Sequence, residues 1–110
     1  MNKLMTVAVI DSGIYPHIDF KNRIVAFKDF VNGRKNAYDD CGHGTHVSGI
    51  IAGSGYASHG RIRGICPSAC LAGIKVLDRL GNGRIENVLD ATDWIISHQK
   101  DLNIRIVNIS

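Results

Sequence analysis

Short, mostly apolar runs constrain the fold of this chain more than any other feature. They occupy residues 6–10 (TVAVI), 71–77 (LAGIKVL) and 104–109 (IRIVNI). Runs of this length and composition are typical of β-strands that are buried on both faces of a parallel sheet. Residues 23–27 form a weaker strand candidate. The sequence therefore predicts three buried strands and a fourth that is less certain from its composition.

Two segments with helical spacing lie between these strands. Residues 44–52 would place Val47, Ile50 and Ile51 on one helix face. Residues 85–99 are the stronger helix candidate, and one face would carry Ile85, Val88, Leu89, Thr92, Ile95 and Ile96. Loops are expected at residues 32–42, 53–64 and 78–83. Strands and helices in alternation predict an α/β fold, a parallel sheet with flanking helices.

Composition excludes several classes of protein. The chain has 110 residues, of which 45% are hydrophobic and 21% charged, and this favours one folded domain over disorder. The net charge of +3 is small and its positive residues are scattered, so no nucleic-acid partner is expected. The longest apolar run, residues 4–10, is far shorter than the roughly 20 residues of a membrane-spanning helix. No secretory signal is visible, so we expect a cytoplasmic chain, or a secreted one if a leader has been removed.

Three cysteines, Cys41, Cys66 and Cys70, make an odd count that argues against a disulfide framework. A bridge between Cys66 and Cys70 is the weaker alternative. It would require the turn at Pro67 to fold the two thiols together.

The first candidate functional residue is Asp11, which follows the first predicted strand within the segment VIDSG (residues 9–13). Functional groups of open parallel sheets gather beyond the carboxyl ends of the strands. Ser110, just past the last predicted strand, would face the same cleft. The alternative for Asp11 is a residue that only caps a turn.

The second candidate is His43, which lies between two glycines in the segment GHGTHVSG (residues 42–49). Gly42 and Gly44 would allow close approach of a backbone or a substrate. At the start of a helix the dipole disfavours the imidazolium, whereas a nearby carboxylate favours it, and this balance suits a general base. The alternative is a surface or capping histidine. His46, one turn further on, is expected to be buried and hydrogen-bonded, and a zinc site with Cys41 or Asp11 is the less favoured alternative.

These segments resemble those of a known enzyme family. VIDSG is similar to the aspartate motif, and HGTHVSG (residues 43–49) to the histidine motif, of the subtilisin-like serine proteases (subtilases, peptidase S8 family). The similarity continues through residues 63–67 (RGICP), 75–77 (KVL) and 107–110 (VNIS), and so covers the whole chain. The resemblance implies a Rossmann-like three-layer α/β fold and serine endopeptidase chemistry.

The resemblance also implies roles for individual residues. Asp11 would orient and stabilise the imidazole of His43, the general base of an Asp-His-Ser triad. A peptide or protein substrate would add a strand along Gly81, Asn82 and Gly83, and Ser110 would begin the opposite wall of the cleft. No cofactor is required. The family leaves open a calcium site with Asp19 as a ligand, although residues 53–60 lack the family's calcium loop.

Cys41, two residues before His43, lies where thiol-dependent members of the family have a cysteine nearby, which would give sensitivity to mercurials. The alternative is a small apolar filler.

The sequence departs from the family in lacking the nucleophilic serine motif and the oxyanion-hole asparagine. We therefore expect residues 1–110 to be the N-terminal part of a subtilase catalytic domain, an incomplete fold that is inactive alone. Two origins stay open, a truncated product and one chain of a nicked enzyme whose complementing C-terminal chain carries the nucleophile. The main alternative is a non-catalytic module that binds peptides or another chain.

Two other classes of protein are disfavoured. An aspartic protease built on Asp11, Ser12 and Gly13 would require an all-β chain, whereas residues 85–99 are predicted to be a helix. A nucleotide-binding domain would require a G-x-G-x-x-G motif after the first strand, and the sequence has none there.

Overall fold

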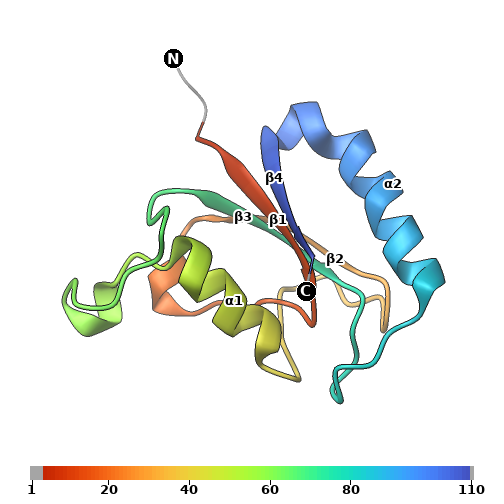
Figure 1. Cartoon of the computed structure of the whole chain (residues 1–110), viewed down its shortest axis with the longest axis horizontal. Coiled ribbons are helices and arrows are strands. Elements are labelled where there is room, and N and C mark those ends of the chain that lie inside the picture. The colour runs from red at the N-terminus through yellow and green to blue at the C-terminus, as the bar shows by residue number, and fades with distance from the viewer. Residues whose placement is uncertain (1–3, 110) are drawn as a thin grey trace.

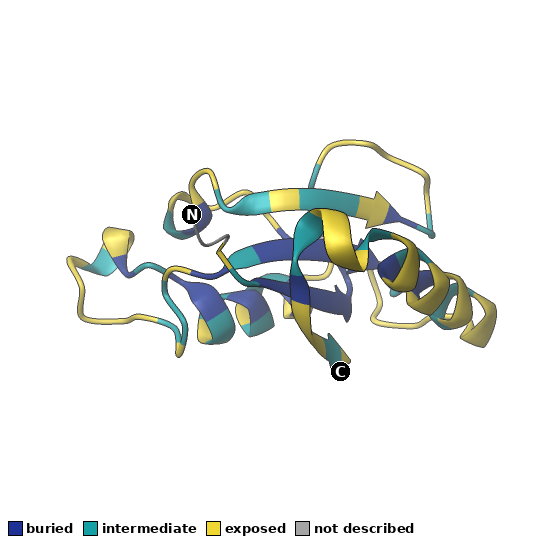
Figure 2. Cartoon of the chain, turned by 90° about the horizontal axis from the view of Figure 1, so that it is seen from above, coloured by how far each residue is buried: buried dark blue, intermediate teal, exposed yellow. Residues whose placement is uncertain are grey.

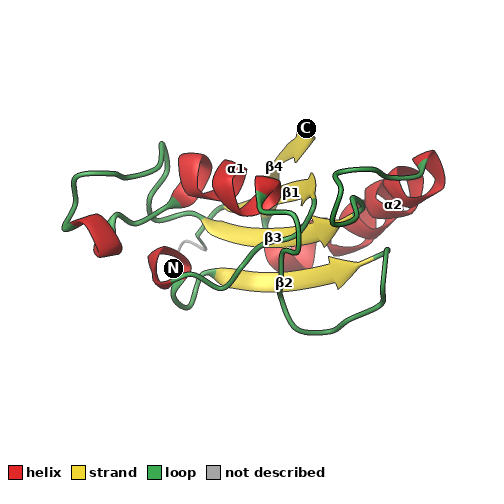
Figure 3. Cartoon of the chain, turned by 90° about the horizontal axis from the view of Figure 1, so that it is seen from below, coloured by secondary structure: helices red, strands yellow, loops and turns green. Residues whose placement is uncertain are grey.

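A four-stranded parallel sheet forms the centre of the molecule, as the computed structural model of residues 4–109 shows (Figure 1). Its strands follow the order β2-β3-β1-β4, with bounds β1 Thr6–Asp11, β2 Ile24–Asp29, β3 Cys70–Lys75 and β4 Ile104–Ile109. Figure 3 shows the four strands side by side and pointing in the same direction. The predicted parallel α/β sheet is confirmed, and the weaker strand candidate is its edge strand β2.

Two helices cover opposite faces of this sheet. Helix α1 spans His43–Ala52 and helix α2 spans Ile85–Leu102, while short 3₁₀ helices lie at η1 (Ile18–Phe20) and η2 (Tyr56–Ser58). Because successive side chains of a strand point to opposite faces, β1 supplies both layers of the core. Val7 and Val9 pack in the layer that contains Ala52 of α1, whereas Ala8 and Ile10 pack in the layer that contains Ala91 and Ile95 of α2.

Burial is concentrated in the two central strands. All six residues of β1 are buried, as are five of the six in β3, whereas β2 and β4 are partly exposed (Figure 2). The carboxyl ends of the central strands are therefore enclosed by neighbours on both sides. Charged residues placed there must be paired within the protein.

The apolar face predicted for residues 85–99 is only partly correct. Helix α2 buries Ala91 and Ile95, with Val88 packed beside them, but Ile85, Leu89 and Ile96 remain 71%, 60% and 69% exposed. The helix lies rotated on the sheet so that one edge of its apolar stripe faces the core. In α1 the same happens to Ile50, which is 52% exposed, while Val47 and Ile51 pack against the core.

Two expectations from the composition can be compared with the structure. Within residues 4–109 no helix has the length and apolar character needed to cross a membrane. Cys41, Cys66 and Cys70 are all free thiols, so the alternative of a bridge between Cys66 and Cys70 is wrong.

A buried hydroxyl on α1 gives a test of this packing. The Ser48 Oγ is buried against the sheet and has no hydrogen-bond partner within residues 4–109. An unsatisfied buried hydroxyl costs about 1–3 kcal/mol. We therefore expect Ser48→Ala to raise the free energy of unfolding by about 1 kcal/mol, measured by urea denaturation followed by circular dichroism.

The matched control is Ser97→Ala on α2, where the hydroxyl is exposed and donates to the Asp93 carbonyl. Both substitutions gain the same helix propensity, so their difference isolates the buried hydroxyl. A Ser48→Ala chain that is less stable than the Ser97→Ala chain would contradict the assignment of an unpaired Ser48.

Candidate active site

Asp11 and His43 lie together at the carboxyl end of the sheet. Asp11 is the last residue of β1 and its side chain is completely buried, and His43 is the first residue of α1. The His43 Nδ1 lies 2.9 Å from both carboxylate oxygens of Asp11. The two motifs that are 32 positions apart in the sequence therefore meet as one hydrogen-bonded pair.

This contact fixes the state of the imidazole. An ionised carboxylate only accepts hydrogen bonds, so the proton of the neutral ring must sit on Nδ1. Within residues 4–109 the ring makes no hydrogen bond through Nε2, and 55% of the His43 side chain is exposed. Nε2 is thus left as an accessible, unprotonated nitrogen that can take up a proton.

The hydrogen bond that His43 donates to Asp11 is the main cause that raises the pKa of His43 above the ordinary value of 6.5, and the negative charge of Asp11 is the second. The charge of Asp39 acts in the same direction, and desolvation opposes both. The sequence analysis expected the helix dipole to lower the pKa of His43 and a nearby carboxylate to raise it. The effect of the carboxylate is the one that gives the direction of the shift. The pair contributes stability below pH 6.5, where the ring is charged in the folded state, and this contribution is lost as the pH rises through the folded pKa.

Gly44 makes this meeting of strand and helix sterically feasible. A Cβ at this position would lie 2.2 Å from the Gly13 carbonyl oxygen and 3.2 Å from the Asp11 Cβ. The close approach predicted for Gly44 is confirmed. At Gly42 no backbone of the described residues approaches closely, because a Cβ there would meet nothing within 4 Å, and close approach of a substrate stays a prediction. Gly42 instead has φ +101°, a left-handed conformation that places the loop at the start of α1.

Asp39 organises the loop before His43, although the sequence analysis did not single it out. Its carboxylate accepts hydrogen bonds from the Ser12 hydroxyl at 2.8 Å and from the Gly42 and Thr45 backbone N–H groups at 2.8 and 2.9 Å. Further donors are the Cys41 N–H and the Thr45 hydroxyl. The Ser12 hydroxyl in turn accepts from the Gly44 N–H at 2.9 Å. Asp39 therefore joins the residue after Asp11 to the first turn of α1.

The hydrogen bonds to Asp39 set its charge state. Burial raises the pKa of this carboxyl, but hydrogen bonds from the Thr45 side chain, the Gly42 and Thr45 backbone and the Ser12 hydroxyl together hold it below the ordinary value of 3.8. A sequence signal did exist. Asp39 lies in the predicted loop at residues 32–42, and aspartate in such a loop commonly accepts hydrogen bonds from nearby backbone N–H groups to close a turn.

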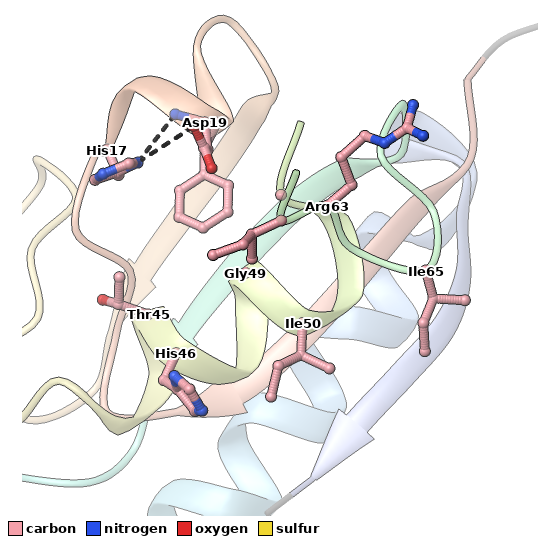
Figure 4. Close-up of a pocket in the computed structure, with 11 residues that line it drawn as sticks. His17, Asp19, Thr45, His46, Gly49, Ile50, Arg63 and Ile65 are labelled. Carbon is pink, nitrogen blue, oxygen red and sulfur yellow. Dashed lines mark hydrogen bonds and ion pairs between the residues drawn. The ribbon is translucent and has the colours of Figure 1, made fainter. Parts of the chain in front are cut away.

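His46 differs from its prediction. It is exposed on the outer side of α1, whereas the sequence analysis expected a buried, hydrogen-bonded residue. It lines a pocket of about 430 Å³ between α1, η1 and residues 62–65, together with His17, Thr45 and Ile50 (Figure 4). His43 does not line this pocket. The physical reason for the error is that α1 buries only its opposite side, through Gly44, Ser48 and Ala52.

The sequence analysis named two metal sites, a zinc site built on His46 and a calcium site with Asp19 as a ligand. Residues 4–109 contain no group of three or more His, Cys, Asp or Glu side chains that could hold an ion, so the zinc alternative built on His46 is wrong. The Asp19 Oδ1 accepts a hydrogen bond from the Ala57 N–H at 2.8 Å. Calcium also binds backbone carbonyl and amide oxygens, so the calcium site with Asp19 as a ligand stays a prediction.

The predicted substrate edge forms an exposed turn. Gly81, Asn82 and Gly83 are all exposed, and the Asp78 N–H donates to the Asn82 carbonyl at 2.8 Å. A single antiparallel bridge between Leu77 and Gly83 closes the turn just beyond β3. Ser110, the other predicted substrate-binding residue, lies outside the described residues.

The hydrogen bonds of Asp39 yield a pH-dependent prediction. Because its folded pKa is depressed, its contribution to stability is present above pH 3.8 and is lost as the pH falls through the folded pKa. Asp39→Asn should lower the free energy of unfolding at neutral pH by about 1–3 kcal/mol, since the amide NH₂ faces donors. The gap between the two chains should shrink on acidification, as followed by urea denaturation from pH 7 to 2.5.

Asp93→Asn on the exposed face of α2 serves as the control, because it removes the same charge without a hydrogen-bonded carboxylate. Equal losses from Asp39→Asn and Asp93→Asn, or a gap for Asp39→Asn that stays constant with pH, would contradict the role given to Asp39.

Comparison with known proteins places this geometry in a family. The model of the subtilase family matches residues 2–110. Serine protease AprX of Bacillus subtilis (strain 168) is 46% identical over 99 residues, which is 90% of this chain and 22% of that protein.

Solved structures agree with the sequence comparison. A cold-adapted subtilisin-like serine proteinase superposes with a TM-score of 0.73 at 35% identity, over 84% of this chain and 32% of that one. The Clostridium perfringens CspB protease superposes with a TM-score of 0.80 at 24% identity, over 96% of this chain and 28% of that one, and supports the fold alone. The chain thus spans between 22% and 32% of the length of these three proteins. The matched motifs, the paired Asp11 and His43 and the subtilisin-like α/β fold show that the chain belongs to the subtilase family.

Proposed function

We propose that this chain supplies the acid–base half of a serine endopeptidase active site, with His43 as general base and Asp11 as the residue that orients and stabilises it. The observation that carries the proposal is the position of His43 Nδ1, 2.9 Å from both oxygens of a buried carboxylate, with Nε2 left exposed. A histidine held in this tautomer is prepared to accept a proton from a hydroxyl group. Membership of the subtilase family supports the reaction class.

The chemistry assigns each proton a place. A serine hydroxyl attacks the carbonyl carbon of the scissile peptide bond while its proton passes to the His43 Nε2. The imidazolium that forms is stabilised by the Asp11 carboxylate, which keeps its hydrogen bond to Nδ1. When the C–N bond breaks, the same proton passes from Nε2 to the leaving amine. Water then hydrolyses the acyl intermediate with His43 again acting as base.

The hydrogen bonds within residues 4–109 support a nucleophile from outside that range. Within that range His43 makes no hydrogen bond to a serine or threonine hydroxyl. The Ser12 hydroxyl is already engaged with Asp39 and Gly44, and Ser48 is buried in α1. We therefore propose that residues 1–110 act as the N-terminal part of a subtilase catalytic domain, are inactive alone, and need a complementing C-terminal segment that carries the serine and the oxyanion donors.

The substrate would be a peptide or protein. The exposed turn of Gly81, Asn82 and Gly83 offers a backbone edge beyond β3, to which an extended peptide could add as a strand. Ser110 would contribute the opposite wall. Small side chains suit such an edge because the peptide backbone must approach closely.

A second function is favoured by the edge of the sheet. β4 is the last strand in the sheet order of the described residues, and Ile106, Val107 and Ile109 on it are 47%, 43% and 62% exposed. An unpaired strand edge with apolar side chains can add a strand from another chain. On this reading the protein is a non-catalytic module that binds a peptide or a complementing chain.

Labelling with a fluorophosphonate probe separates the two functions. The purified chain is incubated with the probe alone and after mixing with a separately produced C-terminal subtilase segment, and intact mass is measured for both chains. The proposal predicts no label on this chain and a label on the added segment only in the mixture. A label on this chain would show that one of its own serines is the nucleophile, and the proposal would be wrong.

Substitution of His43, the proposed general base, tests the catalytic role, and a second histidine serves as the matched control. His43→Ala should reduce labelling and peptide hydrolysis in the mixture by a factor of about 10⁴ or more without preventing association of the chains. His98→Ala on the surface of α2 should leave both unchanged. Association of the chains with equal labelling of the wild-type and His43→Ala mixtures would exclude the catalytic role, and association without labelling would favour the binding module.

A further inference from the structure

Among residues 4–109, the largest fully buried side chain is that of a lysine. Lys75 is the last residue of β3 and its relative exposure is 0%. The strand register places it between Asp11 of β1 and Asp29 of β2, so all three side chains share one face of the sheet. Lysine is almost never fully buried unless its charge is paired, so this ammonium must have a specific set of partners.

Every N–H of the ammonium is used. The Lys75 Nζ donates to the Ser12 carbonyl, the Asp40 Oδ1 and the Leu77 carbonyl, and each of these distances is 2.7 Å. An ammonium has three donors and no acceptor, so these three bonds exhaust it. The ring of Tyr38 lies 5.2 Å from Nζ and adds a cation–π contact.

The three acceptors belong to three different segments around the Asp11–His43 pair. Ser12 directly follows Asp11, Asp40 lies three residues before His43, and Leu77 leads into the exposed turn at residues 78–83. We propose that Lys75 is a positioning residue for the pair, whose buried ammonium fastens the backbone after Asp11 to the loop that carries His43. The inference rests on the proposed function only where it assumes that the Asp11–His43 pair takes part in catalysis. Its test measures the pKa of His43 and does not require activity.

The role differs from that of a core residue that merely fills space. The backbone of β1 is already fixed by the sheet, since the Val76 and Leu77 N–H groups donate to the Asp11 carbonyl. The loop before His43 has a single isolated bridge instead, between Gly13 and Asp39, with the Ile14 N–H donating to the Tyr38 carbonyl at 3.1 Å. It is held to Ser12 by two neighbouring carboxylates, Asp39 through the Ser12 hydroxyl and Asp40 through Lys75 and the Ser12 carbonyl. Loss of the lysine removes the second of these connections.

The readout is the pKa of His43, measured by NMR titration of its ring in the 110-residue chain. Lys75→Met keeps an unbranched side chain that is one heavy atom shorter and removes the ammonium. Loss of a nearby positive charge, together with an unpaired Asp40, would by itself raise the pKa of His43, because both effects favour the imidazolium. Loss of the geometry that presents Asp11 to Nδ1 has the opposite sign, so the direction of the change separates positioning from simple electrostatics.

We expect Lys75→Met to lower the pKa of His43 by about 0.5 or more, toward its ordinary value. Lys28→Met on β2 is the matched control, because Lys28 is exposed and makes no contact with the loop at residues 39–42. It should not lower the pKa. A Lys75→Met chain that is folded but has an unchanged or raised His43 pKa would overturn the proposal and leave Lys75 a structural residue only.

If Lys75→Met does not fold, a second pair of variants tests whether the contact between Lys75 and Asp40 positions the Asp11–His43 pair. The Asp40 side chain is 35% exposed, so its replacement leaves the core intact. Asp40→Asn and Asp40→Ala remove the same charge, but only Asp40→Ala removes the oxygen that accepts from Lys75. The proposal predicts a lower His43 pKa in Asp40→Ala than in Asp40→Asn. Equal values in the two variants would overturn it, whatever the outcome of the protease labelling.

Discussion

The side-by-side register of three parallel strands brings Asp11, Lys75 and Asp29 into one row at the carboxyl end of the sheet, and the rest of the site depends on this row. All three side chains are buried, so each must find partners inside the protein. Asp11 accepts a hydrogen bond from the ring of His43. Lys75 donates to the Ser12 carbonyl, directly after Asp11, and to the Asp40 carboxylate in the loop before His43. Asp29 accepts from the Val31, Asn32 and Arg34 N–H groups and from the Tyr38 hydroxyl. The loop between β2 and α1 is therefore held at its start by Asp29 and at its end by Asp39 and Asp40.

Under the proposed function, this arrangement holds the acid–base half of a catalytic site in place before any substrate or nucleophile is bound. The orientation of His43 is set by its position at the start of α1 and by its hydrogen bond to Asp11, the last residue of β1. Preorganised groups of this kind lower the barrier of a reaction because they need not reorganise during it. The 55% exposure of the His43 side chain leaves room on the Nε2 side for a hydroxyl and a peptide carbonyl. The broad apolar pocket on the outer face of α1 is a separate feature and does not contain the reactive nitrogen.

The elements with strong local signals could be predicted from the sequence. The apolar runs at residues 6–10 and 104–109 are strands, and the segment that begins at His43 is a helix whose first residue meets Asp11. The errors arise where the outcome depends on contacts between distant residues. Lys75 lies inside the apolar run at residues 71–77, and only the folded sheet shows that its ammonium reaches Ser12 and Asp40. The burial of His46 and the apolar face of α2 were misjudged because helical periodicity does not give the rotation of a helix on its sheet.

The central claim is that Asp11 holds His43 in the Nδ1–H tautomer with a raised pKa within this chain alone. The most direct measurement is an NMR pH titration of the His43 ring in the unaltered chain and in Asp11→Asn. The account predicts that the wild-type ring titrates above 6.5, with the proton of the neutral form on Nδ1, and that Asp11→Asn returns the pKa toward 6.5. A wild-type pKa at or below 6.5, or a neutral ring protonated on Nε2, would contradict it.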